Sequence, residues 1–105
     1  MNTFCKAALA AGTIALAGST ALAQSTTLRI QTHYAPETVS GKLAAEYIDN
    51  VQTMSNGEIE IEMFYSSSVV ATVETFDAAS NGIIDCDMTG GGYQTGKNPA
   101  FQFVG

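Results

Sequence analysis

Three short β-rich runs separated by helical patterns constrain the fold of this chain more than any other feature of its sequence. Residues 28–32 (LRIQT) and 59–64 (IEIEMF) alternate apolar and polar side chains, and residues 83–88 (IIDCDM) form a third β-rich run. Alternation of this kind is typical of strands. A strand, helix, strand, helix, strand order implies parallel pairing through right-handed crossovers. The sequence therefore predicts an α/β fold that starts with two parallel βαβ units, a βαβαβ arrangement.

Both connections between these runs carry the signals of a helix. In the first, Thr38 or Ser40 can cap the start and Asn56-Gly57 supplies a left-handed stop, and the second ends in the same way at Asn81-Gly82. Apolar residues recur at helical spacing in each, which predicts two amphipathic helices. They are Val39, Leu43, Tyr47, Ile48 and Val51 in the first, and Val73, Phe76, Ala78 and Ala79 in the second.

Polar residues on alternate positions of all three runs do not fit a parallel sheet covered on both faces, whose strands are nearly all apolar. Two interpretations stay open. Either one face is partly wet, with Arg29 offsetting nearby carboxylates, or further chain covers that face. The final residues 100–105 (AFQFVG) favour the second interpretation, because they resemble the start of another buried element. The polar positions are Arg29, Gln31, His33, Glu58, Glu60, Glu62, Asp85 and Asp87.

The first 23 residues have the three parts of a secretory signal peptide. Residues 1–6 form a short, weakly positive start, residues 7–17 are mainly apolar, and Ala21-Leu22-Ala23 is a small-x-small cleavage signature. A membrane anchor is the alternative, but the run is shorter than the roughly 20 apolar residues that span a bilayer. We expect cleavage after Ala23, a periplasmic location, and a mature chain that begins at Gln24 and is not inserted in the membrane.

Charge and cysteine content exclude several classes of protein. The formal net charge is −6, which disfavours binding to nucleic acid and to anionic lipid. Only one of the two cysteines, Cys86, lies beyond residue 23, so the mature chain has no internal disulfide. Its stability must come from a hydrophobic core, which is marginal in a domain of this size.

A glycine-rich stretch at residues 89–97 (TGGGYQTGK) nearly spells a phosphate-binding P-loop. Asn98 stands where the P-loop needs a Ser or Thr hydroxyl, and Pro99 weakens the helix that would bind phosphate. The three glycines at 90–92 instead allow close backbone approach to an anionic ligand, with Tyr93 as an aromatic wall; a plain flexible turn is the alternative.

Other candidate groups have weaker support. His33 follows the first strand, at the carboxyl end where ligands bind in open α/β sheets, although it can equally be a solvated loop residue. His33 and Cys86 would suit a base and nucleophile pair, but Cys86 has the pattern of a small core residue. Glu58, Glu60 and Glu62 lie roughly 7 Å apart along a strand, too far to share one calcium ion, so a solvated edge face is expected.

Four stretches in order make residues 27–104 similar to the N-terminal part of a known family. They are LRIQTHYAP, SNGEIEIEMFYSSSVV, TVETFDAASNGIIDCDM and GGGYQTGKNPAFQF. The chain resembles the solute-binding proteins of tripartite ATP-independent periplasmic (TRAP) transporters, in the dicarboxylate and keto-acid branch. The resemblance implies a two-lobed α/β periplasmic binding protein, of which residues 24–105 form the start of the first lobe. It implies capture of an organic acid anion for membrane permease subunits driven by an ion gradient, with no enzymatic activity and no cofactor.

The resemblance also places a ligand cleft at the carboxyl ends of the strands. The loops at residues 33–36, 70–74 and 90–93 would face it, and the arginine that clamps the carboxylate would lie in the second lobe, as would most ligands of any metal. Gln94 and Thr95 depart from the aromatic residues expected beside Tyr93, and Cys86 is unusual. The implied ligand-binding residues are His33, Tyr34, Thr72, Glu74, Gly91, Gly92 and Tyr93.

Two alternatives belong to other functional classes. A small secreted α/β hydrolase would use Cys86 and His33, and alkylation of Cys86 would abolish its turnover. A stand-alone interaction module would fold as a stable monomer with no small ligand. An incomplete binding lobe would instead expose apolar surface and melt without sharp cooperativity.

Overall fold

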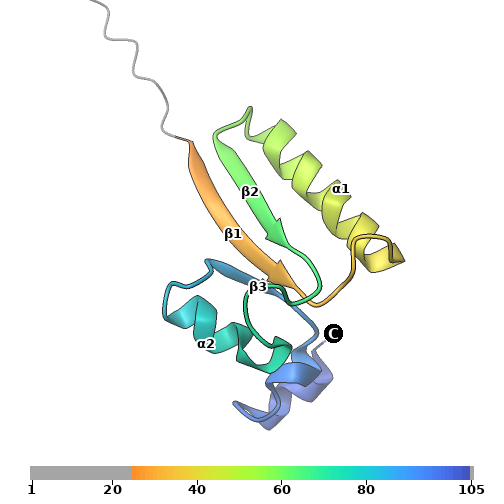
Figure 1. The fold of residues 1–105 in the computed structure, drawn as a ribbon, viewed down its shortest axis with the longest axis vertical. Coiled ribbons are helices and arrows are strands. Elements are labelled where there is room, and N and C mark those ends of the chain that lie inside the picture. The colour runs from red at the N-terminus through yellow and green to blue at the C-terminus, as the bar shows by residue number, and fades with distance from the viewer. Residues whose placement is uncertain (1–24, 105) are drawn as a thin grey trace, which may run out of the picture.

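A computed structural model describes residues 25–104, as three strands, two α-helices and three short 3-10 turns. Figure 1 shows the order along the chain. The signal peptide predicted for residues 1–23 lies outside the described residues. The elements are β1 (Thr26–Thr32), α1 (Val39–Met54), β2 (Ile59–Phe64), η1 (Thr72–Glu74), α2 (Thr75–Ser80), β3 (Cys86–Met88), η2 (Gly91–Gln94) and η3 (Pro99–Phe103).

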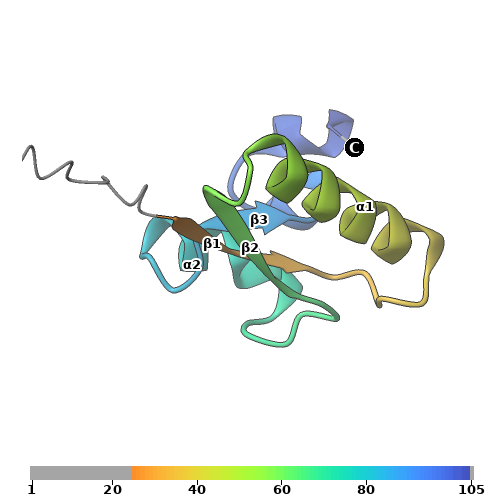
Figure 2. The ribbon, with the colours of Figure 1, turned by 90° about the horizontal axis from the view of Figure 1, so that it is seen from above.

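The three strands form one parallel sheet in the order β2-β1-β3, so the predicted parallel α/β arrangement is confirmed. Leu28 pairs with Ile61 on one side of β1, and Ile30 pairs with Cys86 on the other. Figure 2 shows α1 above the sheet and α2 below it. This arrangement follows from right-handed crossovers that run in opposite directions across the sheet, from β1 to β2 through α1 and from β2 back to β3 through α2.

The predicted ends of α1 are confirmed. Thr38 Oγ1 accepts the Gly41 N–H at 3.0 Å and donates to the Ala35 carbonyl oxygen at 2.7 Å, so one hydroxyl fixes both sides of the N-terminus. After Met54 the chain turns through Asn56 and Gly57, with φ of 53° and 78°. Gly82, with φ of 78°, ends the α2 region in the same left-handed conformation.

The polar alternation is explained by what lies on each face of the sheet. The Arg29 guanidinium donates to the Gly82 carbonyl oxygen, and the Gln31 amide bonds to Val69 and Val70, so both side chains point towards the α2 side. Arg29 also pairs with Asp85 at 3.3 Å, as the partly wet interpretation requires. Ile30 points to the opposite face, towards α1, and is buried.

The outer edge of β2 is the wet part of the sheet. Glu60 and Glu62 are exposed, as predicted for a solvated edge strand. Side chains at the end of α1 cap this edge, because Ser55 Oγ accepts the Ile59 N–H at 3.1 Å and Gln52 Oε1 accepts the Ile61 N–H at 3.0 Å. These bonds occupy backbone donors that an edge strand would otherwise present to solvent.

The third strand is shorter than predicted: residues 83–85 form a bend and only Cys86–Met88 pair with β1. The reason is Asp85, whose carboxylate accepts the Arg29 backbone N–H at 2.8 Å in place of a carbonyl of β3. The pairing of β1 with β3 therefore starts at the residue after Asp85, with Ile30 opposite Cys86. Ile84, in the bend, is fully buried.

The second helix also differs from the prediction. It begins as the 3-10 turn η1 and becomes α-helical only from Thr75. Ala78 and Thr75 are its buried positions, whereas Val73 and Phe76, two of the apolar residues whose spacing predicted this helix, are exposed. The change from a 3-10 turn to an α-helix alters which residues face the sheet. The small side chains of Thr75 and Ala78 therefore lie against it.

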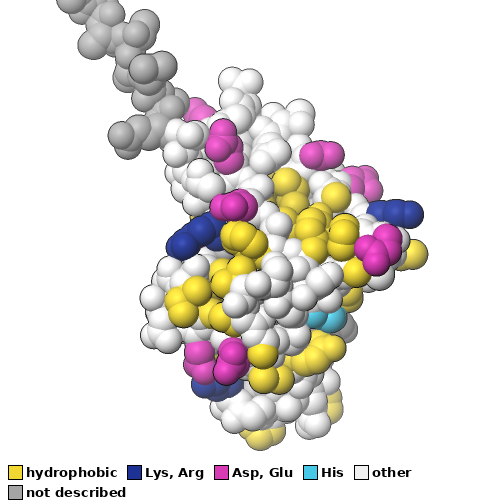
Figure 3. Space-filling view, viewed as in Figure 1, with side chains coloured by type: hydrophobic (Ala, Val, Ile, Leu, Met, Phe, Trp, Pro, Cys, Tyr) yellow, Lys and Arg dark blue, Asp and Glu magenta, His cyan; other side chains and the backbone are white. Residues whose placement is uncertain are grey.

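The apolar stripe of α1 is only partly buried. Ala44 is buried and Ile48 and Val51 are half-buried, but Val39 and Leu43 are 77% and 60% exposed. Figure 3 shows hydrophobic side chains gathered over the region that β2 and α1 occupy in Figure 1. The N-terminal half of the apolar stripe that predicted this helix is therefore not buried among the described residues. Among residues 25–104, no helix is both long enough and apolar enough to cross a membrane.

Candidate functional site

The carboxyl edge of the sheet brings together three aromatic side chains predicted as ligand-binding residues. His33 follows β1 directly, and its ring centroid lies 4.0 Å from that of Tyr34 and 4.9 Å from that of Tyr93. Tyr93 comes from the turn that follows β3, which is parallel to β1. Parallel strands end at the same edge, so this contact joins residues 60 positions apart in sequence.

One ring nitrogen of His33 in this cluster has no hydrogen-bond partner among the described residues. This atom, Nδ1, is buried. Buried polar atoms are normally paired. The histidine is therefore not simply a solvated loop residue, which was the alternative interpretation of its sequence position.

The segment between β2 and α2 is held against the end of β1. Gln31 is fully buried, and its Oε1 accepts the N–H groups of Val69 and Val70 at 2.9 and 3.0 Å. The backbone N–H of Ser66 donates to the Tyr34 carbonyl oxygen at 3.0 Å. Ser66 adopts a left-handed φ of 56°, unusual for serine and compensated by these bonds.

Two predicted residues of this segment have different surroundings. The Thr72 and Ser67 hydroxyl oxygens are 2.7 Å apart, so Thr72 is fixed near the carboxyl edge. Glu74 is exposed at the end of η1. The segment between β2 and α2 thus reaches the carboxyl edge of the sheet at Thr72, while the Glu74 carboxylate stays in solvent.

The glycine loop forms the 3-10 turn η2 and lines a hollow of about 400 Å³. Its lining residues are Val73, Gly92, Tyr93, Gln94, Thr95, Gly96 and Lys97. A side chain at Gly92 would meet open space, so this glycine leaves its backbone accessible. At Gly91, a Cβ would collide with the carbonyl oxygens of Phe101 and Val104. Gly91 is therefore needed for packing of the following turn.

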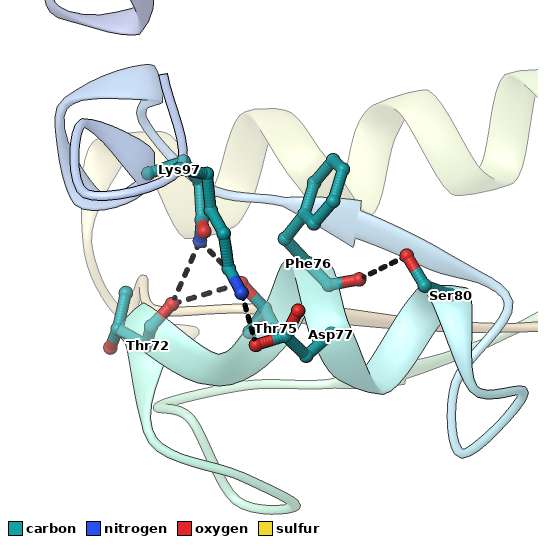
Figure 4. A network of polar contacts seen from close by, with 7 residues as sticks. Thr72, Thr75, Phe76, Asp77, Ser80 and Lys97 are labelled. Atoms are coloured by element: carbon teal, nitrogen blue, oxygen red, sulfur yellow. Dashed lines mark hydrogen bonds and ion pairs between the residues drawn. The ribbon is translucent and has the colours of Figure 1, made fainter. Parts of the chain in front are cut away.

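The segment that resembles a P-loop does not have the P-loop geometry. Lys97 Nζ lies 2.6 Å from Asp77 Oδ2, which joins the loop to α2, as Figure 4 shows. The next helical turn, η3, begins at Pro99 with Asn98 as its cap, because Asn98 Oδ1 accepts the Ala100 N–H at 3.0 Å. The lysine that would contact a terminal phosphate thus contacts a carboxylate.

Gln94 is a buried polar residue of this site that the sequence reasoning considered only as a departure from the family pattern. It is 5% exposed, and its Nε2 donates to Thr75 Oγ1 at 3.1 Å. A glutamine after an exposed tyrosine in a glycine loop carries no signal of burial in the sequence alone. Its partners are known only from the way η2 packs on η1.

The hydrolase alternative, with Cys86 as nucleophile and His33 as base, finds less support in this geometry. Cys86 is partly exposed and pairs with Ile30 in the sheet, whereas His33 lies beyond the end of β1. Across residues 25–104, no group of three or more His, Cys, Asp or Glu side chains is arranged to hold a metal ion.

A parallel α/β sheet with loops gathered at its carboxyl edge is the architecture of a ligand-binding lobe. The chain belongs to the bacterial extracellular solute-binding proteins of family 7 (DctP), whose family model matches residues 30–105. This assignment agrees with the resemblance inferred from the sequence motifs.

Individual relatives are similar over most of the described chain. A monocarboxylate 2-oxoacid-binding periplasmic protein from Nostoc sp. is 30% identical over 70 residues, which are 66% of this chain and 19% of the relative. A TRAP periplasmic solute-binding protein from Rhodobacter sphaeroides, in an apo open structure, is 31% identical with a TM-score of 0.70, covering 74% of this chain and 25% of that one.

A second solved structure has a ligand. The TRAP solute-binding protein from Bordetella bronchiseptica has calcium and picolinate in its active site; it is 28% identical with a TM-score of 0.68, covering 76% of this chain and 24% of that one. The chain therefore spans about a fifth to a quarter of the length of the relatives it matches.

Proposed function

We propose that this chain is part of the solute-binding subunit of a TRAP transporter, which captures an organic acid anion in the periplasm. The observation that carries the proposal is the cluster of His33, Tyr34 and Tyr93 at the carboxyl edge of the sheet, in a chain of the solute-binding family. Relatives at 30% and 28% identity are described as binding a 2-oxoacid and picolinate. Both are small carboxylates, so a 2-oxo or aromatic monocarboxylate is the proposed ligand class.

The proposed division of the chain has two parts. Residues 1–23 form a signal peptide cleaved after Ala23, and residues 24–105 form the beginning of the first lobe. A second lobe would supply the carboxylate-clamping arginine, and closure of the lobes would enclose the anion before delivery to the permease subunits. The subunit binds and releases its ligand without chemical change.

An acidic protein can bind an anion because short-range interactions dominate in a cleft. The formal net charge of −6 acts through water and salt, which screen it. A charge-assisted hydrogen bond in a water-poor cleft is about twice as strong as a neutral one. On the first lobe, the backbone at Gly92 and the Tyr93 hydroxyl are the groups available for such contacts.

The test is calorimetric titration of the native mature protein with matched pairs of ligands. Pyruvate is compared with pyruvamide, and picolinate with picolinamide, each with and without Ca²⁺. We expect the carboxylates to bind and the amides, which lack the charge, to bind at least tenfold more weakly. Equal affinity for acid and amide, or turnover of either, would contradict the proposal.

Two variants connect this binding to the first lobe. Tyr93→Phe removes a hydroxyl at the edge cluster, and Glu74→Gln removes an exposed carboxylate from η1; we expect each to change the affinity for the acid. Lys42→Gln, on the exposed surface of α1, is the matched control and should leave the affinity unchanged.

Sequencing the N-terminus of the native protein tests the proposed cleavage before Gln24.

A further inference from the structure

Gln94 joins two segments that carry predicted ligand-binding residues. Its Nε2 donates to the Thr72 carbonyl oxygen at 3.3 Å and to Thr75 Oγ1 at 3.1 Å. Figure 4 shows that these acceptors lie side by side at the start of the α2 region. Thr75 is fully buried, so water does not compete for its hydroxyl. The glycine loop is therefore tied to η1 by one buried amide.

The same turn sets the position of Tyr93. Tyr93 and Gln94 are consecutive residues of η2, yet Gln94 is 5% exposed and Tyr93 is 45% exposed with its ring against His33. A rotation of this turn that moved one side chain would also move the other. The placement of the Tyr93 ring thus depends on the bonds of the neighbouring amide.

Packing alone does not account for a glutamine at this position. Gln94 Oε1 is buried without a hydrogen-bond partner among the described residues, which is unfavourable for stability. An apolar side chain of similar shape would avoid that penalty. The Thr72 carbonyl oxygen would still accept the Thr75 hydroxyl at 2.9 Å. The amide therefore fixes geometry at a cost to stability.

We propose that Gln94 is a positioning residue of the ligand site: it holds the glycine loop against η1, and so fixes Tyr93 relative to His33 and Thr72. This inference rests on the proposed function, because it names a residue through which the organic acid site is preorganised. Preorganisation increases affinity by reducing the ordering required when a ligand binds.

The first experiment compares Gln94→Met with the native sequence in the full mature protein. Met has a similar length and no amide, so we expect an unchanged or higher Tm and an affinity for pyruvate or picolinate reduced at least fivefold. Gln102→Met is the matched control, because Gln102 is exposed in η3 and outside the site. If Gln94 only stabilised the fold, Gln94→Met would lower Tm, and the changes in Tm and in affinity would go together.

A second measurement does not depend on any ligand. In the ligand-free protein, we expect Gln94→Met to accelerate amide hydrogen exchange in residues 72–75 and 91–94, while Gln102→Met does not. Thr75→Val removes the hydroxyl that Gln94 contacts, and a double-mutant cycle with Gln94→Met should be non-additive in affinity.

The outcomes separate the two proposals. If the native protein binds neither acid, the proposed function fails, and hydrogen exchange alone decides whether Gln94 fixes the loop. If the acids bind but Gln94→Met has the native affinity or native exchange rates, the positioning role is wrong. A fall in Tm that parallels the loss of affinity would also overturn it.

Discussion

Gly91 and Gly92 are neighbours in one turn but have opposite tolerance for a side chain. A Cβ on Gly91 would overlap backbone carbonyl oxygens of the 101–104 turn, whereas a Cβ on Gly92 has no atom within 4 Å. We expect Gly91→Ala to lower the free energy of unfolding by about 1–3 kcal/mol, the usual cost of overpacking a site that cannot yield. Urea unfolding followed by circular dichroism measures this change.

Gly92→Ala is the control for this prediction at the residue scale. Neither glycine has a left-handed φ, so the two substitutions differ mainly in the space around the new methyl group. We expect Gly92→Ala to change stability by less than about 0.5 kcal/mol, as is usual for surface positions. Equal effects of the two substitutions would show that the turn at 101–104 does not pack on Gly91.

At the scale of elements, Asp85 fastens the bend before β3 to the central strand β1. Its carboxylate accepts the Arg29 backbone N–H, and the Arg29 side chain adds a hydrogen bond and an ion pair. These interactions, the backbone bond first, hold the pKa of Asp85 below its ordinary value of 3.8. A carboxylate with a lowered pKa stabilises the fold above its unfolded pKa, and this contribution is lost as the pH falls through the folded pKa.

The resulting prediction concerns acid unfolding. We expect Asp85→Asn to be less stable than the native protein at neutral pH, and the difference to shrink as the pH falls below about 4, near the ordinary carboxyl pKa. Thermal melts across this pH range measure it. Glu60→Gln, which removes an exposed carboxylate from the edge strand, is the matched control for the loss of one negative charge. A constant difference between Asp85→Asn and the native protein at every pH would contradict the expectation.

At the scale of the whole molecule, the described residues leave much apolar surface uncovered. Val39, Leu43 and Tyr47 form an exposed stripe on α1, and Phe103 is 82% exposed. Contiguous exposed apolar patches favour association with another surface. We expect residues 24–105 produced alone to bind a hydrophobic dye, to melt over a broad range and to lack affinity for organic acids.

The control is the native protein, whose intact mass should be measured first. A mass several times that of residues 24–105 is expected if it has the length of its relatives, and dye binding should then be weak. Leu43→Lys in the short piece should reduce its dye binding. A sharp melting transition together with tight acid binding by residues 24–105 alone would contradict the proposal that these residues are only the beginning of the first lobe.

The sequence by itself determined the order and type of the main elements. Thr38 and the Asn56-Gly57 pair mark the ends of α1 through local hydrogen bonds and a left-handed turn, which depend only on nearby residues. The alternation in 59–64 likewise predicted β2 with its wet face. Parallel pairing followed because each crossover is long enough to return the chain to the same end of the sheet.

Only the tertiary structure decided the details that make the site. β3 begins at Cys86 because the Asp85 carboxylate, and not a backbone carbonyl oxygen of β3, accepts the N–H of Arg29, a partner 56 residues away. Gln94 is buried because η2 packs on η1, and His33 meets Tyr93 because β1 and β3 end at one edge. Such contacts depend on the relative placement of distant segments, and no local pattern of polarity or propensity encodes that placement.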